Sequence, residues 1–300
     1  MCIKKKKHAK YGADMDEQKQ RSTNQNENKQ IEEEGLKIIF PVYGETNLQA
    51  PFVHALRLAQ ASRGELEIVD VRNEEEATQH IGVRETLERW GILLPGAHRS
   101  DLEDIGLNIK KVVRPGNKRR EILKRFSKRK HDMLVIGTEK RGALSSLFKN
   151  LPERVAANFN QTILYIPSNG KTIINERTGE LTLRTVLLAV KDKKSCSAAL
   201  EHLKTLLSFF SPVRPAVIGL HAGAKFPSVE KPNAKMCLWL QTARDENLED
   251  AVLSGAKIYN PDLIIMPSKR EAKLARFAGG TLIERIARQV SCPVLKAILP

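Results

Sequence analysis

The strongest constraint in this sequence is an internal repeat, in which the same apolar segments recur at nearly constant offsets. Asp132–Gly137 (DMLVIG) matches Asp262–Pro267 (DLIIMP) at an offset of 130. Thr162–Leu164 matches Pro293–Leu295 at an offset of 131. Self-similarity at a fixed spacing indicates that two copies of one structural unit make up most of the chain.

Each copy alternates short apolar runs with helical patterns. Leu36–Val42 is a strand-like run, and residues 52–59 then place apolar side chains at helical intervals before a stop at Gly64. From residue 36 to residue 166 the order is β-α-β-α-β-α-β-α-β, which predicts a parallel sheet with right-handed crossovers. The opening runs, 38–42 and 186–190, are offset by 148. The second copy is therefore shorter, and the long helical segment of the first copy is the predicted deletion.

The repeat sets the predicted domain boundaries. Before it lies a polar and basic stretch with too few large apolar groups to offset its ordering entropy, so we expect a disordered tail. Between the copies, Asn169-Gly170 and Thr178-Gly179 indicate a polar linker that folds back as a hairpin. The predicted segments are the tail 1–34, the first domain 35–167, the linker 168–182 and the second domain 183–300.

Composition narrows the class of protein. Apolar residues are 41% and charged residues 28% of the chain, as in ordinary globular proteins, which excludes a collagen-like or wholly disordered chain. No apolar run is long enough to span a membrane, so we expect no membrane insertion and a cytoplasmic location. The four cysteines form no C-x-x-C pair, which argues against a zinc site or a disulfide framework and favours buried, reduced thiols.

Several local motifs accompany the repeat and recur in order. They are Pro41–Glu45 (PVYGE), Val135–Gly142 (VIGTEKRG), Glu153–Val155 (ERV), Gln161–Pro167 (QTILYIP) and Ser291–Leu295 (SCPVL). On these motifs the sequence resembles a tandem universal stress protein, with two UspA-like domains over residues 36–298. The resemblance implies an α/β fold of two open, five-stranded, parallel, Rossmann-like sheets in tandem. It also implies a stress-response binding or adaptor protein of a bacterial or archaeal cytoplasm.

Family members that bind ATP place an Asp after the first strand, against the nucleoside. They also carry G-x-x-G-x9-G-[ST] after the fourth strand, because glycines let backbone N–H groups approach the phosphates. The first copy has Tyr43 at the Asp position and keeps Gly137. Its second glycine is displaced to Gly142, and Lys149–Asn150 replaces the final pair. The first copy therefore lacks a complete phosphate loop.

The second copy departs from the same pattern at other positions. Lys191 stands at the Asp position with Asp192 beside it, while Pro267 and Arg270 replace the first two glycines. Only the final pair survives, as Gly280–Thr281. We expect degenerate sites with no cofactor or with weakly bound ATP, at the switch point between the first and fourth strands of each copy. The candidate nucleotide-contacting residues are Gly280, Thr281, Lys191, Asp192, Arg270, Gly137 and Gly142.

Catalytic motifs give no support for an enzyme. The histidines form no H-E-x-x-H array, and no G-x-S-x-G elbow is present. Gly137-x4-Gly142 is followed by Ala-Leu where a P-loop needs Lys-[Ser/Thr]. We therefore expect a non-enzymatic protein. Two alternatives remain open: a weak ATP-binding or slowly hydrolysing module in the second copy, and a basic nucleic-acid-associated protein, since the net charge is +15.

Two surfaces carry partner predictions. The run 118–130 is strongly basic, and Lys124, Arg125, Lys128 and Arg129 are predicted on its outer face, as a site for a protein or polyanion or simply as a solvated helix. Its counterpart 245–250 is acidic. The apolar runs 163–166 and 294–298 end the two copies as exposed edge strands. We expect them to pair within the chain as a pseudo-dimer, with further homodimerisation left open.

Overall fold

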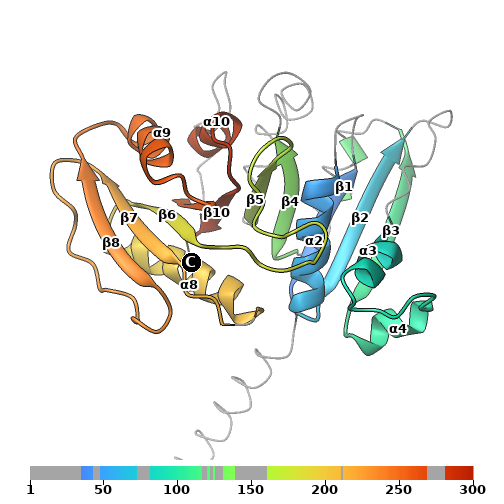
Figure 1. Cartoon of the computed structure of the whole chain (residues 1–300). Helices are drawn as coiled ribbons and strands as arrows, with labels where there is room; N and C mark the ends of the chain where they lie inside the picture. The colour runs from blue at the N-terminus through green and yellow to red at the C-terminus, as the bar shows by residue number, and fades with distance from the viewer. Residues whose placement is uncertain are drawn as a thin grey trace, which may run out of the picture. The chain divides into compact units, whose positions relative to one another are not determined.

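The protein is described here from a computed structural model, in which one large sheet dominates (Figure 1). The predicted tail 1–34 lies outside the described residues, and so do several loops. The described residues are 35–42, 48–72, 82–116, 120–121, 124–125, 131–138, 161–210, 212–268 and 281–299.

Ten strands of the described chain form this sheet, in the order β3-β2-β1-β4-β5-β10-β9-β6-β7-β8. The first half (residues 36–167) contributes β1 (Lys37–Val42), α2 (Gln49–Ala61), β2 (Glu65–Arg72), α3 (Val83–Arg89), α4 (Arg99–Asp104), β3 (Asn108–Pro115), β4 (Met133–Thr138) and β5 (Thr162–Pro167). The second half (residues 183–299) contributes β6 (Thr185–Val190), α8 (Lys193–Ser208), β7 (Ala216–Ala222), β8 (Leu238–Arg244), α9 (Leu248–Tyr259), β9 (Leu263–Ser268), α10 (Leu282–Gln289) and β10 (Val294–Ile298). Within each half the five strands are parallel, as predicted.

The two halves meet at the strands that end them. β10 pairs with β5 in the antiparallel sense, with Leu295 opposite Leu164 and Lys296 opposite Ile163. Both strands are largely apolar, and an unpaired apolar edge invites association, so their pairing satisfies two edges at once. The predicted pairing of these segments within one chain is confirmed.

Helices cover both faces of the sheet, which explains why its central strands are almost continuously apolar. In β1, Ile38 and Phe40 face a core cluster beneath α2 and α8. Ile39 points to the opposite face and joins a second cluster that includes residues of α9 and α10. All three side chains are fully buried.

The strap, residues 168–182, was predicted as a polar linker that turns back on itself. It does so, because Ile174 and Leu181 form an antiparallel bridge. Ile174 is fully buried, and the strap packs against the first half. The indole Nε1–H of Trp90 donates to the carbonyl of Glu176 at 3.0 Å. The strap is thus part of the folded core rather than a free connection.

The imidazole ring of His54 in α2 forms hydrogen bonds with the backbone of the strap. Its Nδ1–H donates to the Ala50 carbonyl at 2.7 Å, which leaves Nε2 as an acceptor. The N–H groups of Ile173 and Ile174 donate to that Nε2 at 3.1 and 3.3 Å. Burial lowers the pKa of His54 to about 4, against the smaller opposing effect of the Ala50 hydrogen bond. The imidazole is therefore neutral at physiological pH.

The halves repeat details beyond strand order. Asp132 Oδ2 accepts from the N–H of Lys37 at 2.8 Å, and Asp262 Oδ2 accepts from the N–H groups of Arg184 and Thr185 at 2.9 Å. Each aspartate thereby fixes the start of its half's first strand beside the fourth. The predicted deletion is also confirmed, because α3 and α4 lie between β2 and β3 whereas residues 223–237, between β7 and β8, contain no helix.

Candidate functional site at the two switch points

Each half contains one point where the strand order reverses. β1 lies between β2 and β4, and β6 lies between β7 and β9. Open α/β sheets bind ligands outside the carboxyl ends of the strands at such a point. The switch between the first and fourth strands is therefore confirmed in both halves, while a nucleotide at either one stays a prediction.

In the first half the structure describes one of the predicted contacts. Gly137 is the penultimate residue of β4, pairs with Ile166 of β5 and is buried. It thus belongs to the sheet at the carboxyl end of β4. The other predicted positions of this half, Tyr43, Gly142 and Lys149–Asn150, lie outside the described residues.

In the second half, Lys191 and Asp192 follow directly after β6. Asp192 is the N-cap of α8, where its Oδ1 accepts from the N–H of Ser195 at 2.8 Å. The Ser195 hydroxyl oxygen accepts in return from the N–H groups of Asp192, at 2.9 Å, and Lys191, at 3.1 Å. This reciprocal capping box satisfies donors that a helix start otherwise leaves open. The carboxylate predicted for a nucleoside is already engaged as a helix cap.

Thr281 is the N-cap of α10 and so lies at a helix N-terminus. Its Oγ1 accepts from the N–H of Glu284 at 3.3 Å, and Glu284 Oε2 accepts from the N–H of Thr281 at 3.0 Å. A phosphate at this helix start would need the same N–H group and the same positive end of the helix dipole. Gly280 and Arg270, the other candidate nucleotide contacts of this half, lie outside the described residues.

Glu284 is a site residue that sequence reasoning missed. The signal was present, because T-x-x-E before an apolar helical pattern is the capping-box signature. Pro267, by contrast, lies where the sequence placed it, at the exit of the fourth strand. Pro267 belongs to β9, where it pairs with Ala297 of β10, and it has no N–H to donate to a phosphate.

A second feature missed by sequence reasoning is an aromatic group beside the end of β6. The Nδ1–H of His221 donates to the carbonyl of Val190 at 2.8 Å. The ring of Phe226 meets His221 edge-on with centroids 6.2 Å apart, and it meets Trp239 in the same way at 6.4 Å. His221 is thus hydrogen-bonded to the last residue of β6, directly before Lys191 in the chain. The sequence signal for His221 was its position near the end of the second strand of this half, β7.

The basic run 118–130 requires one correction. Lys124 is exposed, as predicted, but Arg125 does not lie on an outer face. Its guanidinium pairs with the fully buried carboxylate of Glu67 in β2, which also lies 3.2 Å from Nε2 of His131. The pattern of apolar residues gave no sign of a buried acid beneath this helix. Lys128 and Arg129 lie outside the described residues.

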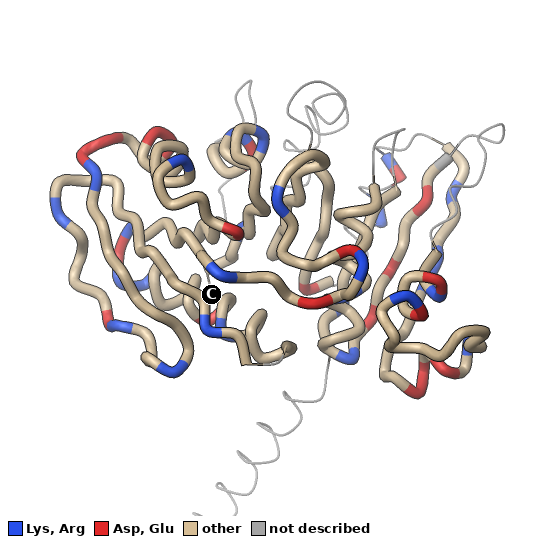
Figure 2. Tube along the Cα trace, in the orientation of Figure 1, with Lys and Arg blue, Asp and Glu red and all other residues tan. Residues whose placement is uncertain are grey.

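The acidic counterpart in the second half is arranged differently. Figure 2 shows acidic residues gathered at the start of α9. Among them, Glu249 pairs with Arg285 of α10 at 2.7 Å, close to solvent. Its hydrogen bond from Arg285 lowers the pKa of Glu249. The first half thus has an arginine–glutamate pair with a buried carboxylate, Arg125–Glu67, and the second half has an exposed pair, Arg285–Glu249.

The described cysteines do not offer a reactive thiol. Cys196, Cys237 and Cys292 are buried, as the sequence predicted. Burial raises the pKa of Cys196 to about 11 and that of Cys292 to about 12. The thiolate is the nucleophilic form, so these thiols are unreactive near neutral pH. Within the described ranges, no three His, Cys, Asp or Glu side chains gather as a metal site.

Sequence comparison identifies the first half. Residues 36–167 match the model of the Universal stress protein family. The first half is a universal stress protein (Usp) domain. The family match ends with β5, and the second half repeats the strand order of the Usp domain beyond it. No curated protein sequence is significantly similar to the chain.

Solved structures resemble both halves together. A universal stress protein from Archaeoglobus fulgidus DSM 4304 is 14% identical with a TM-score of 0.53, covering 88% of this chain and 96% of that chain. A functionally unknown protein from Pseudomonas aeruginosa PAO1 is 10% identical with a TM-score of 0.55, covering 88% and 93%. At these identities the likeness shows the fold. No helix in the described part of the chain is long and apolar enough to cross a membrane.

Proposed function

We propose that this chain is a non-catalytic binding or adaptor protein of the stress response, built from two Usp domains whose nucleotide sites are degenerate. The Usp domain at residues 36–167 supports the family assignment. The same strand order in both halves and the equivalent roles of Asp132 and Asp262 support a second Usp domain at 183–299.

One observation carries the proposal that the nucleotide sites are degenerate: the capping box between Thr281 and Glu284. The Glu284 carboxylate accepts the N–H that a phosphate oxygen would need, and it places a negative charge at the helix start. Phosphate binding there must displace this carboxylate and overcome its repulsion. At the end of β6, the Asp192 carboxylate is already engaged by the N–H of Ser195, which further disfavours a nucleoside there.

The test is nucleotide binding by the full chain. We expect native mass spectrometry of the purified protein to show no stoichiometric nucleotide. Calorimetry should give an ATP dissociation constant no tighter than about 100 μM, which corresponds to about 5.5 kcal/mol. Phosphate release from ATP should equal that of buffer alone. Co-purifying ATP, or a micromolar dissociation constant, would replace this proposal with the alternative of a nucleotide-binding second half.

A matched pair of variants tests the physical reason. Glu284→Gln keeps an oxygen acceptor for the Thr281 N–H and removes the charge, so we expect ATP affinity to rise about fivefold. Glu230→Gln makes the same change at an exposed acid between β7 and β8, in another segment from the capping box, and it should leave ATP affinity unchanged. No gain for Glu284→Gln would contradict the electrostatic explanation.

A further inference from the structure

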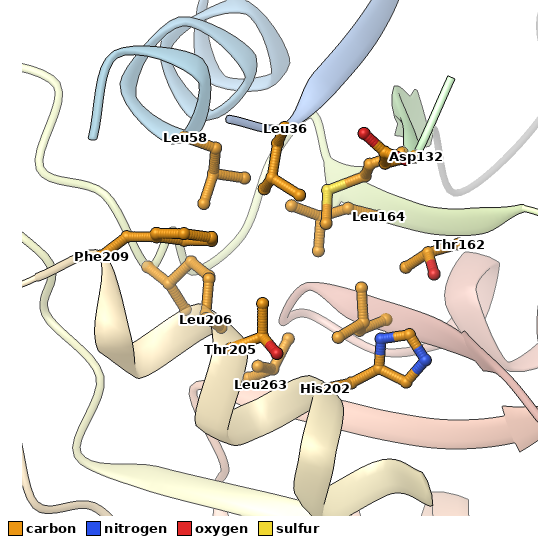
Figure 3. A pocket seen from close by; sticks show the side chains of 13 residues that line it. Leu36, Leu58, Asp132, Thr162, Leu164, His202, Thr205, Leu206, Phe209 and Leu263 are labelled. Atoms are coloured by element: carbon orange, nitrogen blue, oxygen red, sulfur yellow. The ribbon is translucent and has the colours of Figure 1, made fainter. Parts of the chain in front are cut away.

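A cavity of about 250 Å³ lies between the two halves, on the sheet face that carries α2 and α8 (Figure 3). Strand residues of both halves line it, among them Met133 of β4, Leu164 of β5 and Leu295 of β10. Of the described residues at the two switch points, Gly137, Lys191 and Asp192 are not among those that line the cavity. Nothing in the proposed nucleotide chemistry involves this cavity.

The walls of the cavity come in equivalent pairs from the two halves. Leu58 of α2 faces Leu206 of α8 across it, and the two are offset by 148, like the opening strands. Leu164 and Leu295 are direct partners in the β5–β10 pair. The cavity thus lies where the two repeats meet, and neither half alone contains it.

Polar groups break this symmetry at one end. In Figure 3, Asp132, Thr162 and His202 lie on one side of the cavity, while Leu58 and Phe209 lie on the other. The cavity is therefore apolar along its body and polar at one end. Such a combination is typical of small-molecule sites, where a few polar groups orient an otherwise apolar ligand.

The polar end is rich in hydrogen-bond acceptors. The Nε2–H of His202 donates to the carbonyl of Ile298 at 3.1 Å, which leaves Nδ1 as the ring nitrogen that can accept a hydrogen bond. Asp132 contributes a carboxylate, and Thr162 a hydroxyl that both donates and accepts. A ligand that fits this end brings an N–H or O–H donor. A ligand carboxylate there would be repelled by Asp132.

We propose that this junction cavity binds a small neutral molecule with a fused aromatic body and one hydroxyl or N–H donor, the donor being directed to His202. The size agrees, because a cavity of about 150 Å³ holds one benzene molecule and this one is larger. Thr205 and Asp132 are exposed, so the cavity has an entrance from solvent.

The test measures binding of 2-naphthol to the full chain by calorimetry. 2-Methoxynaphthalene has nearly the same body without a donor, and 2-naphthoate carries a carboxylate instead. We expect 2-naphthol to bind about fivefold tighter than 2-methoxynaphthalene, and 2-naphthoate to bind more weakly than both. No binding of 2-naphthol, or tighter binding of 2-naphthoate, would overturn the proposal.

Variants locate the binding. Leu206→Phe fills the cavity and Thr205→Trp blocks its entrance from an exposed position, so each should abolish 2-naphthol binding. Leu240→Phe, on an exposed face of β8, is the matched control and should bind as the parent does. His202→Leu should bring the affinity ratio of 2-naphthol to 2-methoxynaphthalene close to one. If Thr205→Trp, folded by circular dichroism, binds 2-naphthol like the parent, the site is elsewhere and the proposal fails.

Discussion

The two halves place a histidine at the same position of the same helix and use it differently. His54 of α2 and His202 of α8 are offset by 148, like the opening strands. His54 is fully buried and accepts from two N–H groups of the strap. His202 is half-buried and faces the junction cavity. The strap packs on α2, so the difference arises from what covers each helix rather than from the repeat itself.

Replacing these histidines should give the largest effect and the sharpest contrast. His54→Ala leaves the buried N–H groups of Ile173 and Ile174 without their acceptor and opens a cavity. We therefore expect the free energy of unfolding to fall by about 4 kcal/mol. His202→Ala removes one hydrogen bond at a half-buried site, and the expected loss is about 1 kcal/mol. Urea denaturation of the full chain measures both. Equal losses would show that the strap does not depend on His54.

The pH dependence of stability should separate the same two residues. Burial lowers the pKa of His54 to about 4, below its ordinary 6.5, so the unfolded chain binds the extra proton between these values. The stabilisation is complete above pH 6.5 and decreases as pH falls toward 4, by about 3 kcal/mol at most. His54→Asn should lose this contribution to the pH dependence of stability, whereas His202→Asn should keep it. If the free energy of unfolding of His54→Asn depended on pH as the parent's does, His54 would not be the group responsible.

The arginine pairs extend the comparison to the other face of the sheet. Arg125→Gln removes one charged partner of the buried Glu67 carboxylate, and we expect the free energy of unfolding to fall by about 2 kcal/mol because Arg125 is partly solvated. Arg285→Gln breaks the exposed pair with Glu249, and the expected loss is below about 0.5 kcal/mol. Thermal denaturation of the two variants checks the ranking. A larger loss for Arg285→Gln would reverse the assignment of buried and exposed pairs.

The smallest effects are expected at exposed lysines on the helices of the same face. Lys124→Gln in the first half and Lys257→Gln in α9 should each change stability by no more than about 0.5 kcal/mol. Affinity for duplex DNA at low salt, measured by fluorescence anisotropy, should fall equally in both, since each removes one positive charge. A selective loss with Lys124→Gln would favour the alternative of a polyanion site on the basic run.

Part of the candidate site could be read from the sequence, and the residues that sequence reasoning missed or misplaced have specific causes. The Thr281–Glu284 capping box is a local pattern, and Pro267 excludes a phosphate-binding N–H wherever it lies. Arg125 was assigned to the surface because apolar spacing shows which helix positions face inward but not which groups lie beneath them. Its partner Glu67 is 58 residues away in another element.

The sequence by itself determined the sheet. Two repeated sets of apolar runs separated by helical patterns require parallel strands with helices on both faces, and apolar last strands lead the halves to pair. Only the tertiary structure decided which of the two equivalent histidines is buried and where a cavity remains. Those outcomes depend on contacts between the strap, α2 and α8, which are far apart in the chain. Side-chain burial is a property of the packed assembly, so local periodicity alone does not encode it.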